Sequence, residues 1–433
     1  MAKPKLALIP ASQGSELFSV LPSSGVGDFD FSRSGRATRI NSQGLIEEVA
    51  NGQSRLNYPM IDGKVVGCPH HILEPQSTNR QSYSEDLISG FSNGATSVSS
   101  NVIISPDGTL NADKLVESNT NARHELYWAT ISFSGTTSVS FFAKASERRY
   151  ISVFIGGNPA VGGATFDVED GVVSLMSGGT DASIVNYGNG WYRCSLTSTN
   201  AGSYQVYYCL RTNASAVDVQ TYQGDGTSGM YLWGFQTEVG QSYPTSYIKS
   251  NSGSTTTRSA ETANGSGDAA TFSDSEGVLM MEGSILDFST TDSWISISEN
   301  SNINNNQFNL RFISNSNLIQ AVSRANGLGQ DVVLQHTLND KTEVNKISIK
   351  YKLNDWGLWV NGFEVDTETS SNAFTPNSLD VLDFDRGNNS KSLYGKTKQL
   401  QYYNSALTDS ELEKISSWTS FTDMAQGQLY TIE

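Results

Sequence analysis

The sequence predicts an all-β protein with two antiparallel β-sandwich (jelly-roll) domains, an irregular N-terminal segment before them, and one short helix near the C-terminus. Three observations lead to this prediction. Strand-like apolar runs recur at short intervals along most of the chain, with turn sequences between them. The composition is 37% hydrophobic and 17% charged with 39 glycines, which suits a packed, turn-rich protein rather than a disordered one. A helical period occurs in one stretch.

Residues 1–82 form the irregular segment. Pieces such as "LALIPASQGSELFSVLP" and "GDFDFSRSGRATRI" read as brief strands broken by turn residues, and two prolines interrupt "CPHHILEPQSTNR". Such a segment buries little by itself, so we expect a partner or a second copy of the chain to order it. We expect its arginines to be exposed, which makes Arg33, Arg36, Arg39 and Arg55 candidates for attachment to other proteins.

Residues 83–248 are expected to form the first sandwich. Runs such as "HELYWATISF", "RYISVFIGG" and "GMYLWGFQTEVG" alternate with the turn sequences "PDG", "EDG" and "GNG". Residues 249–276 are rich in Ser, Thr and Gly and nearly free of large apolar groups. They are therefore expected to be a linker with an extended strand or two.

Residues 277–420 are expected to form the second sandwich. Asn361-Gly362 lies between two alternating apolar runs, which is a strong signal for a two-residue hairpin turn. The helix begins after Thr408, because Thr408 and Glu411 have the spacing of a capping box and Leu412 and Ile415 follow at helical spacing. Residues 421–433 are expected to be a tail.

Charge excludes one class of function. The net charge is −16, and residues 1–81 carry eight Lys and Arg against seven Asp and Glu, which leaves −17 for the rest. Nucleic-acid binding needs a basic surface, so we expect none. No signal peptide or membrane-length apolar run is present, so we expect no membrane insertion.

The three cysteines, Cys68, Cys194 and Cys209, have no metal-site spacing. We expect free, mostly buried thiols, in keeping with assembly in a reducing cytoplasm, with a Cys194–Cys209 disulfide as the alternative.

A row of carboxylates raises the question of catalysis. In "GFEVDTE", strand alternation would place Glu364, Asp366 and Glu368 on one face. Some polysaccharide-cleaving sandwiches use such a row, and these three residues are the catalytic candidates under a hydrolase interpretation. The hairpin turn before them offers a simpler explanation, the solvent face of a strand. We therefore expect a protein that is not an enzyme.

Aromatic residues crowd the first sandwich: Tyr127, Trp128, Trp191, Tyr192, Tyr207, Tyr208, Tyr231 and Trp233. Aromatic faces stack on sugar rings, but alternate strand residues also fill a core. Trp191 and Tyr192 should point to opposite faces, so one of them should be exposed. Trp191, Tyr192 and, in the second sandwich, Trp356 are the candidates for carbohydrate binding.

No cofactor is expected, and the identity of any metal is left open. The turns "DVEDG", "GDGTSG" and "DFDRGNN" offer carboxylates that suit a structural Ca²⁺, although Asp and Asn are also ordinary turn residues. His70 and His71 are adjacent, and adjacent strand side chains diverge, so a shared metal is not expected. Neither a G-x-S-x-G elbow nor a phosphate-binding loop occurs.

The N-terminal run "FSRSGRATRINSQGLIE" and the later "LEPQSTN" resemble a segment common in tailed-bacteriophage virion proteins, where it precedes sandwich domains of fibres and appendages. The residues that carry this resemblance are Phe31, Arg33, Ala37, Thr38, Arg39, Asn41, Gly44, Leu45, Ile46, Glu47, Leu73, Glu74, Pro75, Gln76, Thr78 and Asn79.

The two sandwiches carry resemblances of their own. "PDGTLNADKLVE", "FFAKASER" and "NGWYR" resemble carbohydrate-binding-module-like jelly rolls. "LWVNG" and "QYYNSALTDSELEKISSW" resemble concanavalin A-like or laminin-G-like sandwiches. Thr367 departs from the apolar residue that the hydrolases of this fold have, which weakens an inherited catalytic role.

Together these resemblances imply a virion structural protein: a head or tail fibre, an appendage or a capsid decoration that contributes to adhesion on host-surface glycans. They imply other virion proteins as partners of the N-terminal segment, a homo-oligomer (trimer or dimer), and a location in the virion after assembly in the host cytoplasm. The alternatives are a purely scaffolding virion protein and a polysaccharide depolymerase.

Overall fold

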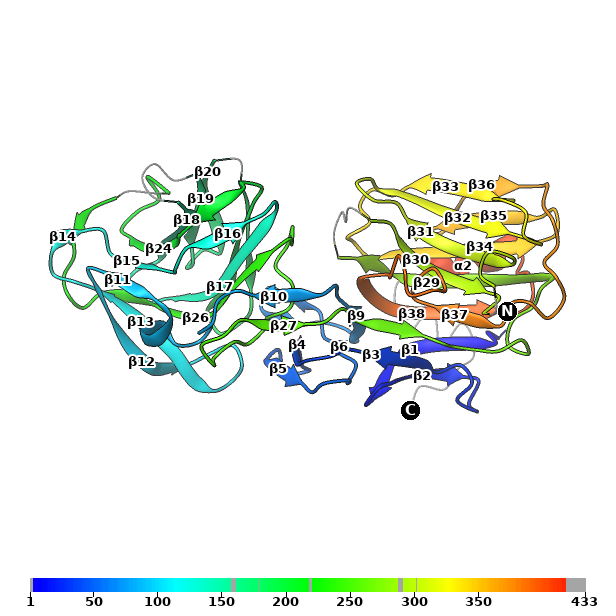
Figure 1. The fold of residues 1–433 in the computed structure, drawn as a ribbon, viewed down its shortest axis with the longest axis horizontal. Helices are drawn as coiled ribbons and strands as arrows, with labels where there is room; N and C mark the ends of the chain where they lie inside the picture. The colour runs from blue at the N-terminus through cyan, green and yellow to red at the C-terminus, as the bar shows by residue number, and fades with distance from the viewer. Residues whose placement is uncertain are drawn as a thin grey trace.

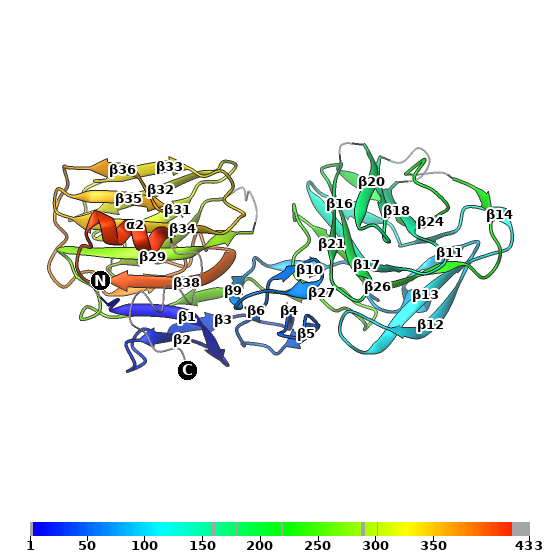
Figure 2. The same cartoon turned by 180° about the vertical axis from the view of Figure 1, so that it is seen from behind.

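The computed structural model describes residues 3–156, 161–178, 180–217, 220–286, 291–300 and 302–417. Two β-rich lobes lie side by side with a narrower connector between them (Figures 1 and 2). We call residues 83–248 the middle lobe and residues 33–82 with 249–261 the connector. The C-terminal lobe consists of residues 3–32 together with 262–417. The expected tail, 421–433, lies outside the described residues.

The middle lobe is a sandwich of two six-stranded antiparallel sheets. One sheet has the order β11-β15-β24-β18-β19-β20 and the other β12-β13-β26-β17-β22-β21. The elements are α1 (Leu87–Gly90), β11 (Ser92–Gly94), β12 (Thr96–Ile104), β13 (Leu110–Glu117), β14 (Asn121–Ala122), β15 (Glu125–Tyr127), β16 (Ile131–Phe133), β17 (Thr137–Ala145), β18 (Tyr150–Ile155), β19 (Gly162–Asp167), β20 (Val172–Ser177), β21 (Thr180–Asn186), β22 (Trp191–Ser198), β23 (Gly202–Tyr204), β24 (Val206–Arg211), β25 (Tyr222–Gln223) and β26 (Gly229–Val239).

Aromatic side chains join the two sheets of this lobe. Tyr208 of β24 meets Phe141 of β17 at 5.1 Å and Phe235 of β26 at 4.8 Å between ring centroids, both edge to face. All three are fully buried. Edge-to-face aromatic pairs contribute about 0.5–1.5 kcal/mol beyond their buried area, so this cluster fixes how the sheets pack.

The C-terminal lobe is a second antiparallel sandwich. Its larger sheet has the order β28-β3-β2-β1-β38-β29-β34-β35-β36, with β9 joined to β38 and β6 to β9, and its smaller sheet the order β33-β32-β31-β30-β37. The elements are β1 (Leu6–Gln13), β2 (Glu16–Leu21), β3 (Phe29–Ser32), β28 (Thr262–Asn264), β29 (Glu276–Ile285), β30 (Ser293–Ser298), β31 (Gln307–Phe312), β32 (Leu318–Arg324), β33 (Val333–Thr337), β34 (Asn345–Lys352), β35 (Trp356–Val360), β36 (Phe363–Glu368), β37 (Val381–Asp383), β38 (Gly395–Tyr403) and α2 (Asp409–Ser417). The expected all-β fold class is confirmed.

The first three strands of the chain belong to this lobe. β1 pairs with β38, with Leu6 opposite Tyr402, and β3 pairs with β28. Leu6 and Phe29 are fully buried in the same hydrophobic core as the strands of residues 276–403. The expectation that the N-terminal segment buries little by itself is therefore wrong for these strands, because the far end of the same chain completes their sheet. Figures 1 and 2 show β1, β2 and β3 along the lower side of this lobe.

The connector holds short strands that reach both lobes, since β9 joins the larger sheet of the C-terminal lobe and β5 packs against the middle lobe. They are β4 (Ala37–Ile40), β5 (Ile46–Val49), β6 (Leu56–Asn57), β7 (Met60–Ile61), β8 (Lys64–Val65), β9 (His70–Leu73), β10 (Ser77–Asn79) and β27 (Thr256–Arg258). Ile46 of β5 lies in one apolar cluster with Phe142, Trp191 and Trp233 of the middle lobe. The expected linker thus contains two short strands, since β27 pairs with β10 and β28 with β3.

A buried network of charges holds the connector together. Arg55 donates to Glu261 at 2.9 Å and to Glu74 at 2.7 Å. Arg33 donates to Glu261 at 2.9 Å, and Arg258 lies 2.6 Å from Glu74. These side chains are 0–2% exposed. The expected exposure of Arg33 and Arg55 is therefore wrong, because both pair with carboxylates inside the connector.

The carboxylate of Glu74 reports the strength of this network. Burial by itself would raise its pKa, but Arg258 and Arg55 outweigh burial and hold the pKa of Glu74 at about 2. Removing one partner from such a buried group leaves an uncompensated charge in the interior, which costs about 3–5 kcal/mol. The network therefore ties residues 33–74 to residues 258–261 and makes the connector a built joint.

Several local predictions are confirmed. Cys194 and Cys209 are free and buried, while Cys68 is free and exposed. Asn361 and Gly362 have φ of 50° and 91°, the positive values that a type I′ turn requires. The backbone N–H of Thr408 donates to Glu411 at 3.1 Å, and that of Glu411 donates to the Thr408 hydroxyl at 3.4 Å, which is the capping box. Among the described residues, neither helix has the length and apolar character needed to cross a membrane.

Candidate functional site

The carboxylates of β36 do not form a row. A β-bulge interrupts the pairing of β35 with β36 between Leu358 and Trp359, so Glu364 lies opposite Trp359 and Asp366 opposite Leu358. Leu358 faces the lobe's main core, whereas Trp359 packs in the separate cluster that includes α2. The expectation that Glu364, Asp366 and Glu368 share one face is wrong, because the bulge breaks the two-residue alternation.

These carboxylates also have ordinary structural partners. β36 is the edge strand of its sheet. Asp366 accepts a 2.8 Å hydrogen bond from the backbone N–H of Gln335, which joins the edges of the two sheets. Glu368 accepts hydrogen bonds from two backbone N–H groups of the loop that follows it. The bulge therefore separates Glu364 from Asp366 and Glu368, which lie opposite Leu358 and Trp356.

Two of the three aromatic candidates for sugar binding are core residues. Trp191 is 2% exposed and donates its indole N–H to the carbonyl of Ile104 at 3.0 Å. Trp356 is 3% exposed inside the C-terminal lobe. Neither offers a ring face to a ligand, so these two expectations are wrong. Tyr192 is half-buried, as the alternation with Trp191 predicts, but no pocket described below includes it.

The two remaining arginine candidates lie at the surface. Arg36 pairs with Glu48, and Arg39 pairs with Glu47 at 3.0 Å, both across the β4–β5 hairpin. The side chain of Arg36 is 76% exposed and that of Arg39 is 30% exposed. Of the four arginines, these two are thus accessible to a partner.

In the part of the chain that the structure describes, no cluster of three or more His, Cys, Asp or Glu side chains could hold a metal ion. The turn carboxylates have other partners: Asp167 and Asp170 pair with Arg149, and Asp225 accepts from the N–H groups of its own turn. Burial lowers the pKa of His70 to about 3 and that of His71 to about 4, so both are neutral side chains packed in β9.

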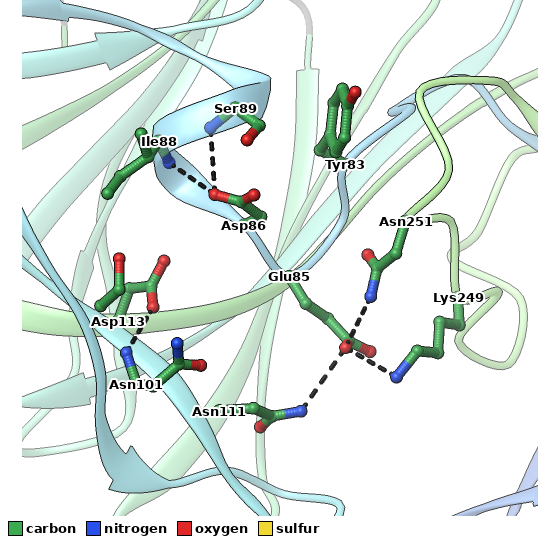
Figure 3. Close-up of a pocket in the computed structure, with 11 residues that line it drawn as sticks. Tyr83, Glu85, Asp86, Ile88, Ser89, Asn101, Asn111, Asp113, Lys249 and Asn251 are labelled. Carbon is green, nitrogen blue, oxygen red and sulfur yellow. Dashed lines mark hydrogen bonds and ion pairs between the residues drawn. The ribbon is translucent and has the colours of Figure 1, made fainter.

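A polar pocket opens instead beside α1 (Figure 3). Its volume is about 560 Å³. It lies between α1, the β12–β13 pair and residues 249–251. We call it the acidic pocket; its lining residues are Tyr83, Glu85, Asp86, Ile88, Ser89, Ser100, Asn101, Asn111, Asp113, Lys249 and Asn251.

Glu85 is the most connected side chain of the acidic pocket. It is 8% exposed and accepts hydrogen bonds from Asn251 at 2.9 Å and from Tyr247 at 2.9 Å. Lys249 lies 2.8 Å from the same carboxylate. Figure 3 shows Asn111, Asn251 and Lys249 converging on Glu85 from different segments. The Glu85 carboxylate is thus held in one orientation before any ligand arrives.

Two aspartates, Asp86 and Asp113, line another wall of the acidic pocket. Asp86 is the N-cap of α1 and accepts from the backbone N–H groups of Ile88 and Ser89, both at 3.0 Å. Asp113, 2% exposed, accepts from the N–H of Asn101 at 2.8 Å, and burial raises its pKa. Lys249 balances Glu85, so Asp86 and Asp113 leave the pocket with excess negative charge.

A second, aromatic pocket of about 210 Å³ lies at the C-terminal end of α1 and shares Ser89 with the acidic pocket. We call it the aromatic pocket; its lining residues are Ser89, Gly90, Phe91, Ser92, Tyr127, Trp128, Ala129 and Gln205. Trp128 is half-buried and meets Phe91 edge to face at 5.5 Å. A Cβ at Gly90 would lie 2.9 Å from Tyr83 and 3.4 Å from Trp128, so this glycine allows the two aromatic residues to flank α1 closely.

The two pockets together, which we call the α1 surface, could be found only in part from the sequence. Tyr127 and Trp128 belong to the aromatic residues noted there, and Asp86 before Leu87 is a typical N-cap signal. A four-residue helix is too short to show a period, and nothing in the sequence links Glu85 to residues more than 160 positions away.

Comparison with known proteins gives neither a family model nor a curated protein that matches this chain. Solved structures do match. The CBM40 of the Ruminococcus gnavus IT-sialidase, bound to α2,3-sialyllactose, is 16% identical with a TM-score of 0.30 over 35% of this chain and 93% of that one. The leech intramolecular trans-sialidase is 18% identical with a TM-score of 0.30 over 34% of this chain and 24% of that one.

Sheep galectin-11, in complex with glycerol, is 7% identical with a TM-score of 0.21 over 29% of this chain and 89% of that one. At these identities and TM-scores the likeness carries no argument about what this chain binds.

Proposed function

We propose that this protein is a non-catalytic adhesion and structural subunit of a tailed-bacteriophage particle, and that the α1 surface binds a neutral glycan. The observation that carries the glycan proposal is that the acidic pocket and the aromatic pocket both lie at α1 and share Ser89. A saccharide offers hydroxyls that carboxylates and amides hydrogen-bond, and ring faces that stack on aromatic side chains. The α1 surface presents both kinds of group.

Charge selects the class of glycan. Asp86 and Asp113 are not neutralised by a cation within ion-pair distance among the described residues, so an acidic sugar would be repelled there. A neutral or amino sugar can donate its hydroxyl or ammonium protons to these oxygens. An open, shallow site of this kind binds weakly, and many copies on one particle would raise the avidity.

The full chain tests the glycan proposal directly. We expect binding to neutral or amino-sugar glycans on an array, and a five- to tenfold loss for Trp128→Ala, since an aromatic contact contributes about 1 kcal/mol. Phe363→Ala is the matched control, because Phe363 is 74% exposed and lies in the other lobe. Absence of binding by the full chain, or equal binding by Trp128→Ala, would contradict the proposal.

The non-catalytic part of the proposal is supported by the split carboxylates of β36 and has its own test. We expect no release of reducing ends when the chain is incubated with polysaccharides that it binds. Release that disappears in Glu364→Gln or Asp366→Asn would reinstate the depolymerase interpretation.

The virion part of the proposal is supported by the resemblance of residues 31–47 and 73–79 to virion proteins. Deleting the N-terminal segment would not test attachment, because β1 to β3 complete the C-terminal lobe. The double variant Arg36→Glu/Arg39→Glu, on the exposed β4–β5 hairpin, leaves that lobe intact. We expect it to reduce incorporation into particles, with Lys414→Glu on exposed α2 as the control. Normal incorporation of the double variant would place the attachment surface elsewhere.

A further inference from the structure

A third cavity lies where the connector meets both lobes. Its volume is about 240 Å³, which is room for roughly eight water molecules or for one six-membered sugar ring with its substituents. Connector residues such as Arg39, middle-lobe residues such as Tyr187 and Arg193, and Lys396 of the C-terminal lobe all line it. We call it the joint cavity. No lobe forms it alone, so it exists only in the assembled chain.

The joint cavity has two positive charges without a carboxylate partner. Arg39 is paired with Glu47, and Glu74, the carboxylate of the lining, is neutralised by Arg55 and Arg258. Arg193 and Lys396 remain. Among the residues that the structure describes, none places a carboxylate oxygen within 4.0 Å of either side chain. The cavity is therefore electropositive, whereas the acidic pocket is electronegative.

Arg193 is built into the wall, and its Nε is left without an acceptor. It is 7% exposed, and its guanidinium donates to the Ser140 hydroxyl at 3.0 Å and to the carbonyl of Thr245 at 2.8 Å. Its Nε is buried and has no hydrogen-bond acceptor. A buried donor without an acceptor is costly and rare in folded proteins, so an acceptor supplied by a ligand would remove that cost.

Lys396 provides the second charge. It lies in β38 opposite Ile72 of β9, and burial lowers its pKa because the ammonium group has lost much of its water. Glu74 and Glu343 act from longer range and offset only part of this lowering of the Lys396 pKa. A desolvated ammonium gains more from a bound anion than an exposed one does.

Aromatic rings complete the wall. Tyr187 meets Phe142 at 4.9 Å with its ring perpendicular, and the Arg193 guanidinium lies 5.5 Å from the centre of the Phe142 ring. These contacts hold the arginine and the rings in one arrangement. A free inorganic anion would use the cations alone, whereas a ring that carries a carboxylate would use the cations and the apolar faces together.

We infer that the joint cavity binds one carboxylate-bearing sugar residue of the hexuronic acid type, with its carboxylate between Arg193 and Lys396. The unpartnered Nε–H of Arg193 and the Lys396 ammonium can each donate a charge-assisted hydrogen bond to that carboxylate, and such a bond is about twice as strong as a neutral one. The site is separate from the α1 surface and does not depend on ligand binding there.

Calorimetric titration of the full chain tests this site with three probes: glucuronate, glucose and inorganic phosphate. We expect glucuronate to bind at least tenfold more tightly than glucose and more tightly than phosphate. Tighter binding of phosphate than of glucuronate would reduce the cavity to an anion site without sugar recognition and overturn the inference. Absence of glucuronate binding would overturn it outright.

Variants then assign the binding to the cavity. We expect Lys396→Met to weaken glucuronate binding about tenfold, and Lys398→Met, two residues further along β38 and outside the lining, to leave it unchanged. Arg193→Lys keeps the charge but removes the buried Nε donor, so it should also weaken binding, and it serves if Lys396→Met does not fold. Unchanged affinity in both Lys396→Met and Arg193→Lys would overturn the inference.

The Trp128→Ala variant separates this inference from the proposed function. It should retain full glucuronate affinity even though its neutral-glycan affinity falls five- to tenfold. Loss of glucuronate affinity in Trp128→Ala would show that glucuronate binds at the α1 surface instead, which would overturn the assignment to the joint cavity.

Discussion

The two lobes are both antiparallel sandwiches, but they are assembled from the chain in different ways. The sheets of the middle lobe come from one continuous stretch, β11 to β26. The larger sheet of the C-terminal lobe has β1 next to β38, so its centre joins the two ends of the described chain. The middle lobe can therefore form from one continuous stretch of chain, whereas the larger sheet of the C-terminal lobe needs strands that lie almost 400 residues apart in the sequence.

Removal of residues 1–32 should break this comparison with the largest effect. It deletes β1 to β3 and the buried side chains of Leu6, Leu8, Leu17, Phe29 and Phe31. At about 1.5–3 kcal/mol for each buried side chain, the loss is on the order of 10 kcal/mol, enough to unfold the C-terminal lobe. Calorimetry should show one thermal transition lost and the transition of the middle lobe kept. Removal of residues 1–3 is the control, and an unchanged thermogram for the long deletion would contradict the assembly described above.

The connector joins the two lobes, and the variant Glu261→Gln tests whether its buried charge network stabilises it. Glu261 is fully buried between Arg33 and Arg55, so the change leaves these cations under-neutralised and should cost about 3–5 kcal/mol. Urea denaturation measures the loss. Glu48→Gln breaks the exposed pair with Arg36 and should cost less than about 1 kcal/mol. Equal effects of the two variants would mean that burial of the network is not what stabilises the joint.

Acid should destabilise the connector at β9, the strand that pairs with β38 of the C-terminal lobe, because β9 carries His70 and His71. The unfolded chain protonates His70 and His71 below about pH 6.5, whereas the folded chain resists until about pH 3 and 4. Between those values the unfolded state binds more protons, so the free energy of unfolding falls as the pH drops. From pH 7 to 5 we expect a loss of about 2 kcal/mol per histidine, measured by urea denaturation at each pH.

The variant His71→Gln should remove its own share of that pH dependence. Gln335→Ala, on β33 of the C-terminal lobe, changes no titratable group and should leave the dependence as it is. A flat profile in the unmodified chain would rule out the histidines of β9 as the source of acid sensitivity.

The smallest effect is expected at the cap of α2. Thr408→Ala removes the hydroxyl that accepts from the Glu411 N–H, which should cost about 1 kcal/mol in the C-terminal lobe alone. Ser410→Ala, at an exposed position in the first turn, is the control and should cost less. A thermal shift in the middle lobe instead would show that the lobes unfold as one unit.

Local signals predict local structure well in this chain. The Asn361-Gly362 turn, the Thr408 capping box and the free, buried Cys194 and Cys209 all follow from neighbouring residues or from composition. The pairing of β1 with β38 has no such signal, because strand alternation shows which face is buried but not which strand lies alongside. A β-bulge is equally silent in the sequence, which is why the face of Asp366 was predicted wrongly.

The sites depend even more on distant pairings. Trp191 and Trp356 are aromatic residues of the right type, but the packing of other segments covers them. Glu85, Lys249 and Asn251 meet only because residues 249–251 return to the start of the middle lobe. The sequence predicts Arg33 and Arg55 as surface charges, whereas in the fold they are buried beside Glu261 and Glu74. Side-chain chemistry could be anticipated, whereas which residues lie close together could not.

The pairing of β1 with β38 also sets an order of events during synthesis. The middle lobe has all of its strands once residue 239 has left the ribosome, but Leu6 has no partner until Tyr402 has been made. At about 5–20 residues per second, the interval between the synthesis of Leu6 and that of Tyr402 is roughly 20–80 s. For that time the apolar strands β1 to β3 are exposed in the nascent chain, where they are candidates for chaperone binding.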